Sequence, residues 1–159
     1  IDEGNALSEI SPGGNRLRLG RYSESGRVYL LTSVTRDRAP FFSDWRMGRL
    51  LVNAFRQAEN EGAARSLAWV VMPDHFHWLV ELQNVHLPVL MCKTKSRTVR
   101  AFNEATGTHD RLWQKGYHDR AVRREEDLQA IARYIVTNPI RAGLVKRVHD
   151  YPLWDAIWI

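Results

Sequence analysis

Apolar residues along this chain follow two periods, which predict strands and helices in turn. Strands are expected at Val28–Thr35, Ser66–Met72 and His75–Leu82, because these runs are rich in β-branched and aromatic residues. The last two runs are separated only by the turn Pro73-Asp74, which predicts a hairpin. The segment Arg111–Val122 is predicted to be an irregular strand.

Apolar residues at helical spacing predict helices between these strands. A cap at Ser43 or Asp44 begins a helix that runs to about Glu61. A second helix is expected at Leu87–Ala105, and a third at Glu125–Thr137, where an Asn-Pro pair ends it because the residue before proline avoids helical geometry. The resulting order predicts an α+β fold: a ferredoxin-like antiparallel sheet with helices on one face.

The length of 159 residues favours a single domain. Residues 1–15, rich in Gly, Ser and Asn, are expected to form a flexible tail, residues 16–150 the domain, and residues 151–159 a C-terminal tail. Cys92 is the only cysteine, which excludes an internal disulfide or a Cys-rich zinc site and fits a reducing cytoplasm. No apolar run approaches the roughly 20 residues of a membrane span, and no signal peptide is expected.

Positive charge is the strongest compositional feature, with a net charge of +5 and a pI near 9.7. Arginine predominates, and its guanidinium suits bidentate contact with phosphate. The clustered cations are candidate contacts to a polyanion: Arg16, Arg18, Arg21 and Arg27; Lys93, Lys95 and Arg97; Arg120, Arg123 and Arg124. A generic solvated basic surface is the alternative.

His75 and His77 flank one residue of a predicted strand, so both side chains project from the same face. Two adjacent imidazoles can hold one divalent cation and leave coordination positions for phosphate oxygens. Hydrogen bonding across the sheet is the alternative for such a pair. The sequence has no carboxylate cluster of the kind that two-metal nucleases use.

Tyr134 and Asn138 lie one helical turn apart near the end of the third helix, on the flank of its apolar stripe. Taken alone, they are a boundary aromatic residue and a C-terminal cap. Together with the histidines they suggest covalent catalysis, because a cation would help a phenol with a pKa of about 10 to attack phosphorus. The Asn138 amide oxygen is a candidate third ligand.

Other aromatic and polar residues carry weaker signals. His118-Asp119 is expected to have a structural or DNA-contacting role rather than acid-base chemistry. Several aromatic side chains could stack on unpaired bases, although packing is the stronger expectation for most of them. These residues are Trp113, Tyr117, Trp154 and Trp158.

Two segments of the chain resemble the REP-associated tyrosine transposases, which are single-tyrosine HUH enzymes. They are VVMPDHFHWLVEL, with its His-hydrophobic-His motif, and LWQKGYHDRAVRREEDLQAIARYIVTNPIRAGLV. The upstream stretch GRVYLLTSVTRDRAPFF is similar to the first strand of that family. The resemblance therefore extends from about Arg16 to Val145.

The resemblance implies a ferredoxin-like fold, Mg²⁺ or Mn²⁺ held by His75 and His77, and Tyr134 as the nucleophile. Asn138 matches the position of a third metal ligand, where many relatives have Gln. The implied activity is metal-dependent cleavage and rejoining of DNA, as in transposition and recombination, through a phosphotyrosine intermediate. The implied partner is single-stranded DNA with a palindromic REP hairpin, and both a monomer and a homodimer remain open.

Two other functions compete with this one. A non-catalytic DNA-hairpin-binding protein would retain a vestigial HUH site. A replication initiator or relaxase of the HUH type is disfavoured by the short chain, which has no helicase or oligomerisation domain. A covalent protein–DNA adduct would separate an enzyme from a binding protein.

Overall fold

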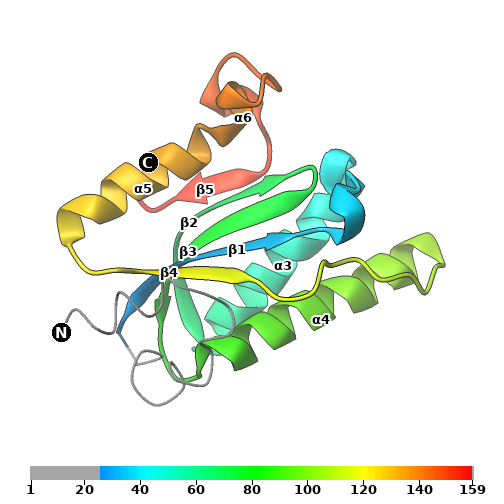
Figure 1. The fold of residues 1–159 in the computed structure, drawn as a ribbon, viewed down its shortest axis with the longest axis horizontal. Helices are drawn as coiled ribbons and strands as arrows, with labels where there is room; N and C mark the ends of the chain where they lie inside the picture. Colours follow the sequence, from blue (N-terminus) through cyan, green and yellow to red (C-terminus); the bar gives the residue numbers. More distant parts are fainter. Residues whose placement is uncertain (1–25, 159) are drawn as a thin grey trace.

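The computed structural model describes residues 26–158, which form a five-stranded antiparallel sheet with helices on both sides (Figure 1). The strand order is β4-β1-β3-β2-β5. The strands are β1 Val28–Val34, β2 Ala64–Met72, β3 His75–Leu82, β4 His118–Val122 and β5 Trp154–Ala156. The first four have the connections and order of a ferredoxin-like sheet, which confirms the predicted α+β fold class.

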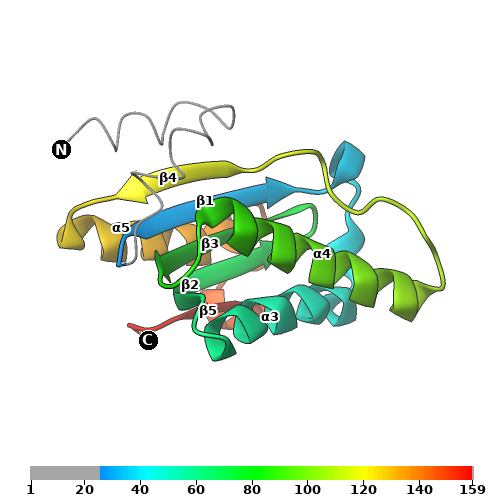
Figure 2. The same ribbon diagram turned by 90° about the horizontal axis from the view of Figure 1, so that it is seen from below.

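Helices α3 (Trp45–Asn60) and α4 (Leu87–Thr106) lie next to each other on one face of the sheet (Figure 2). The Asp44 side chain caps α3 by accepting a hydrogen bond from the backbone N–H of Arg46 at 3.0 Å. The core under these helices is aromatic. The Phe55 ring, for example, stacks on the Trp78 ring with centroids 4.4 Å apart.

Helix α5 (Glu125–Val136) covers the opposite face, so the prediction that all helices pack on one face is wrong. Ile131 and Ile135 of α5 pack against a second apolar cluster that includes Val70 of β2 and Leu79 of β3. The physical reason is visible in β2, where both odd and even positions from Leu67 onward are buried. A strand that is apolar on both faces needs cover on both.

The end of the chain also differs from the prediction, because residues 151–156 belong to the domain. Strand β5 pairs with β2, and the Tyr151 hydroxyl donates a hydrogen bond to the backbone oxygen of Val71 at 2.5 Å. Leu153 packs so closely against α3 that a Cβ at Gly48 would overlap it. The predicted C-terminal tail is therefore part of the sheet edge as far as Ala156.

Short elements complete the described part of the chain. Only the end of the predicted strand at residues 111–122 is β4, and Trp113 makes one isolated bridge to Thr35. The short helix α6 (Asn138–Arg141) follows α5. Three 3-10 helices lie at Arg36–Arg38, Phe41–Ser43 and Val148–Asp150. Within residues 26–158, no helix is long and apolar enough to cross a membrane.

Candidate active site

The histidine pair lies on β3 and points to the face that α5 covers. Strand alternation sends Phe76 into the aromatic core, where it is fully buried, and leaves His75 and His77 on the other side. The two imidazole centroids are 5.0 Å apart. The rings therefore share one face, as the alternation predicts, while their role as metal ligands stays a prediction.

Each imidazole is held through its Nδ1 atom. His75 Nδ1 donates a hydrogen bond to Asp74 Oδ1 at 2.7 Å, and Arg38 binds the other oxygen of this carboxylate at 2.9 Å. His77 Nδ1 is hydrogen-bonded to Thr32 Oγ1 at 2.8 Å, from the position directly opposite on β1. Partners of this kind orient metal-binding histidines in proteins. They leave the Nε2 atom of each ring for a ligand.

The surroundings of His77 and Asp74 shift the pKa values of both groups downward. Burial lowers the pKa of His77 to about 4, and repulsion from His75 and Arg141 contributes to the shift. Burial alone would raise the pKa of Asp74, but hydrogen bonds from His75 and Arg38 outweigh it and hold that pKa below its usual value. At neutral pH, His77 is therefore a neutral imidazole and Asp74 a charged acceptor.

Asn138, the predicted third ligand, begins α6 directly after the end of α5. Its side chain is half-buried and has no hydrogen-bond partner among residues 26–158. The same residues contain no group of three or more His, Cys, Asp or Glu side chains that could hold a metal ion. The donors present are two imidazoles and the Asn138 amide; imidazole suits transition metals, while carbonyl oxygens also suit Mg²⁺ and Mn²⁺.

Tyr134 lies on α5 with 61% of its surface exposed, and Arg141 of α6 covers one face of its ring. The Arg141 guanidinium carbon is 3.8 Å from the ring centroid. This guanidinium also donates to the backbone oxygen of Tyr134 and to Thr137 Oγ1, both at 2.6 Å. The charge of Arg141 also contributes to lowering the pKa of His77, after burial and the charge of His75.

Sequence reasoning missed three residues of this arrangement. Arg141 follows the Asn-Pro pair at which the sequence predicts the end of the helix, so its contact with Tyr134 had no helical-spacing signal. Asp74 directly precedes the first histidine, so a hydrogen bond to it could have been proposed. Thr32 carries no local signal, because only the strand register places it opposite His77.

The predicted basic contacts fall into separate regions. Arg16, Arg18 and Arg21 lie outside the described residues, and Lys93 is exposed on α4. Arg27, Arg123 and Arg124 line a concavity where β1 and β4 meet the start of α5. Arg120 is exposed on β4 and pairs with Leu30, whose side chain packs on the α5 face. These four arginines therefore lie toward the Val28 end of β1, whereas the histidines pair with the other end of that strand.

The other two predicted contacts on α4, Lys95 and Arg97, bind within the fold. Lys95 is half-buried, and its Nζ donates to the backbone oxygen of Gly116 at 2.7 Å. Burial lowers the pKa of Lys95. Arg97 donates to Glu61 Oε2 of the neighbouring α3 end at 2.6 Å. Both side chains hold α4 in place, and their predicted contact with DNA stays a prediction.

Comparisons with known proteins identify the family. The family model described as "Transposase IS200 like" matches residues 25–138, a range that contains the histidine pair and Tyr134. The chain belongs to this IS200-like transposase family. The resemblance seen in the sequence is thereby confirmed at the level of the family.

Individual proteins similar to this IS200-like transposase are REP-associated tyrosine transposases. The REP-associated tyrosine transposase of Escherichia coli (strain K12) is 26% identical over 134 residues, which cover 83% of this chain and 78% of the relative. A Haemophilus influenzae protein named for the same type is 27% identical over 143 residues, 80% of this chain and 78% of its own. A solved REP-associated tyrosine transposase bound to a REP hairpin aligns with a TM-score of 0.69 and 26% identity, covering 84% of this chain and 79% of that one.

Proposed function

We propose that this IS200-like transposase is a metal-dependent endonuclease and strand transferase that acts on single-stranded DNA with REP-type hairpins. The observation that carries the proposal is the position of Arg141. Its guanidinium covers the ring of Tyr134, the candidate nucleophile, on the face of the sheet to which His75 and His77 also point. The solved relative that is bound to a REP hairpin supports the choice of substrate.

In the proposed reaction, Tyr134 Oη attacks the phosphorus of the scissile phosphodiester. A phosphorus–oxygen bond to the tyrosine forms, the bond to one deoxyribose oxygen breaks, the phenol loses its proton and the departing sugar oxygen gains one. Rejoining reverses these steps, with a sugar hydroxyl displacing Tyr134. Because one phosphodiester replaces another, the bond energy is kept for strand transfer.

The surrounding residues have separate roles in this proposal. His75, His77 and Asn138 would hold Mg²⁺ or Mn²⁺, which when bound supplies positive charge to the phosphate oxygens. Asp74 and Thr32 keep the imidazoles oriented through Nδ1. Arg141 is a positioning residue, because it restrains the Tyr134 ring and caps the last turn of α5.

The DNA path in this proposal runs along the α5 side of the sheet. Arg27, Arg120, Arg123 and Arg124 are at the β4–α5 end of that side and supply the sequence-independent contacts to phosphate. Arg16, Arg18 and Arg21 precede this region in the chain and remain candidate contacts to the hairpin.

A covalent-adduct assay tests the proposal. Labelled single-stranded DNA that carries a REP-type hairpin is incubated with the protein in Mn²⁺ or EDTA and resolved on a denaturing gel. We expect an SDS-stable protein–DNA adduct that requires the metal and is absent when His75 and His77 are both replaced by Ala. Tight binding with no adduct in any metal would instead indicate the hairpin-binding protein with a vestigial site.

A further inference from the structure

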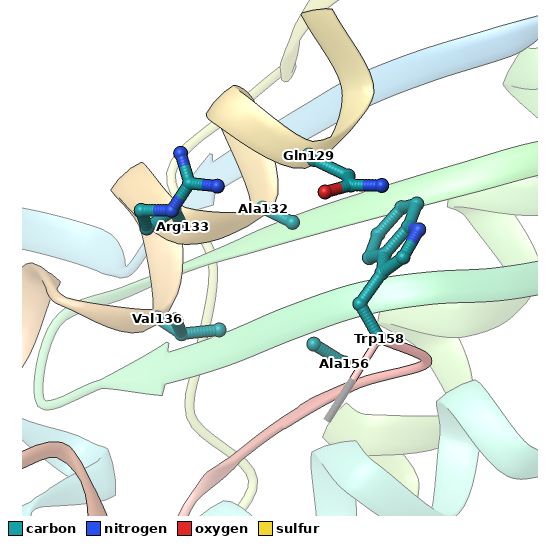
Figure 3. Close-up of a pocket in the computed structure, with 6 residues that line it drawn as sticks. All are labelled: Gln129, Ala132, Arg133, Val136, Ala156 and Trp158. Carbon is teal, nitrogen blue, oxygen red and sulfur yellow. The ribbon is translucent and has the colours of Figure 1, made fainter. Parts of the chain in front are cut away.

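A cavity of about 200 Å³ lies between α5 and β5, at the edge of the sheet (Figure 3). It is separate from the histidine pair, which lies on the central strand β3. Its lining residues are Gln129, Ala132, Arg133, Val136, Ala156 and Trp158. None of them belongs to the site proposed above.

The lining combines an apolar floor with polar groups that have no partner within residues 26–158. Ala132, Val136 and Ala156 are buried and form the apolar part. In Figure 3 the Gln129 side chain extends toward the Trp158 indole, and Arg133 lies at the other end of the cavity. An aromatic plane, an amide and a cation therefore border one small space.

Trp158 differs from the other tryptophans that could stack on bases. Trp113 is buried and its Nε1 donates a hydrogen bond to the backbone oxygen of Lys95. The Nε1 of Trp154 donates to the backbone oxygen of Val148. Trp158 is 38% exposed, and its indole lines the cavity.

We propose that this cavity binds one unpaired base of the DNA strand that Tyr134 cleaves, an inference that rests on the proposed function. The volume is below the roughly 300–1,000 Å³ of pockets for drug-sized ligands, so it suits a single planar ring system. Stacking on aromatic rings and hydrogen bonding to base edges are the usual means of holding unpaired bases. Trp158 supplies the stacking surface, Gln129 the hydrogen bonds, and Arg133 a cation for the adjoining phosphate.

The position of the cavity relative to Tyr134 sets which base it can reach. Arg133 directly precedes Tyr134 on α5, and both side chains are exposed. A helix with its side chains is only about 10–12 Å wide. A strand whose scissile phosphate is at Tyr134 can therefore cross α5 beside Arg133 and place a base in the cavity a few nucleotides away.

The first test is the affinity of the full chain for a REP-type hairpin with single-stranded flanks, measured by fluorescence anisotropy in EDTA. We expect Trp158→Ala to weaken binding about tenfold, within the effect of removing one stacked base. Trp158→Phe should bind like the wild type. Trp45→Ala is the matched control, because Trp45 is also exposed but lies on α3, on the opposite face; it should leave the affinity unchanged.

The second test locates the base by placing an abasic nucleotide at each flank position in turn. Removing the base at one position should weaken wild-type binding about tenfold but should not weaken the binding of Trp158→Ala any further. Such a position is called coupled to Trp158. Equal effects of Trp158→Ala and Trp45→Ala, or the absence of any coupled position, would overturn the proposal. If Trp158→Ala lowers the melting temperature, Gln129→Leu on the exposed side of α5 takes its place in the same scan.

The adduct assay separates this inference from the proposed function. A coupled base position without any adduct from the wild type would overturn the cleavage activity and leave the base pocket standing. An adduct without a coupled position would overturn the base pocket alone. We expect both to hold, with the control Trp45→Ala forming adduct at the wild-type rate.

Discussion

The two faces of the sheet are built from different residues. Under α3 and α4 the core is aromatic, with Phe55 in contact with the rings of Trp69, Phe76 and Trp78. Under α5 it consists of aliphatic and small residues such as Ile135 and continues into polar side chains. The first face contains most of the large buried side chains. The second face contains the partly buried His75 and His77.

Strand β3 serves both faces with adjacent residues. Phe76 is fully buried in the aromatic core, whereas His75 and His77 point to the α5 side. A shift of one residue in the register would exchange these positions, burying the histidines and exposing the phenylalanine. Packing of Phe76 in the aromatic core therefore fixes the register of β3 that directs His75 and His77 to the α5 side.

The largest effect is expected at the nucleophile. Tyr134→Phe should reduce adduct formation by more than about 1,000-fold, because a reacting group is removed. Its affinity for the hairpin and its melting temperature should stay near wild type, since the ring is exposed. Tyr151→Phe is the matched control. It removes the hydrogen bond to the Val71 oxygen and should lower the free energy of unfolding by about 1 kcal/mol, while DNA cleavage stays at the wild-type rate. Cleavage by Tyr134→Phe at the wild-type rate would remove this tyrosine from the reaction.

The aromatic face should dominate the free energy of unfolding. Phe55→Ala leaves a cavity among three aromatic rings and should cost about 4 kcal/mol in urea denaturation. Leu79→Ala, under α5, is the comparison and should cost about 3 kcal/mol. A larger loss for Leu79→Ala than for Phe55→Ala would contradict this division between the faces.

Arg141 can be tested apart from its capping role. Arg141→Gln keeps hydrogen-bond donors but loses the charge, and should slow adduct formation at saturating DNA about 100-fold. Arg141→Lys should recover part of this rate. Thr137→Ala removes one partner of Arg141 but keeps the charge over Tyr134, and should react like the wild type. A wild-type rate for Arg141→Gln would limit Arg141 to capping α5.

The partly buried His77 makes stability depend on pH. The pKa of His77 is about 4 in the folded protein, against 6.5 for an unperturbed histidine in the unfolded chain. The unfolded chain therefore takes up the proton first as pH falls. The contribution of neutral His77 to the free energy of unfolding is fully present above about pH 6.5. It should fall by about 2 kcal/mol between pH 7 and pH 4.5. His77→Gln should lack that part of the decline in urea denaturation, and His149→Gln, at an exposed position, should retain it. Parallel curves for wild type and His77→Gln would contradict the assignment.

The smallest expected effect is on the salt dependence of DNA binding, which should differ between Arg120 on the α5 side of the sheet and Arg97 on α4. Arg120→Gln should lower the slope of log affinity against log salt by about 0.7, the value for one phosphate contact to single-stranded DNA. Arg97→Gln should leave the slope unchanged, because Glu61 already pairs with that guanidinium. An equal loss of slope for Arg97→Gln would place DNA on the α4 side as well.

Much of the fold follows from local patterns. The hairpin of β2 and β3 and the helices α3, α4 and α5 were predictable within a few residues, because period and capping signals lie in adjacent residues. The face of α5 was not predicted, although the continuous burial of β2 carries the signal. Strand β5 was missed because a three-residue edge strand has too little pattern of its own.

The candidate site divides in the same way. His75, His77 and Tyr134 stand out by residue type and spacing, and all three lie within the range that the family model matches. Arg141 did not stand out, because the Asn-Pro pair before it predicts the end of the helix that carries Tyr134. Thr32 did not stand out either, because its contact with His77 depends on the pairing of two strands whose residues are 45 positions apart.

The sequence by itself determined the element types, the shared face of His75 and His77, and the basic character of the chain, since each depends on residue identity and on periods of a few residues. Only the tertiary structure decided that α5 and α6 bring Tyr134 and Arg141 to that face, and that Lys95 and Arg97 bind within the fold. The physical reason is that these outcomes depend on which surfaces meet. Contacts between distant segments decide that, and no local period encodes them.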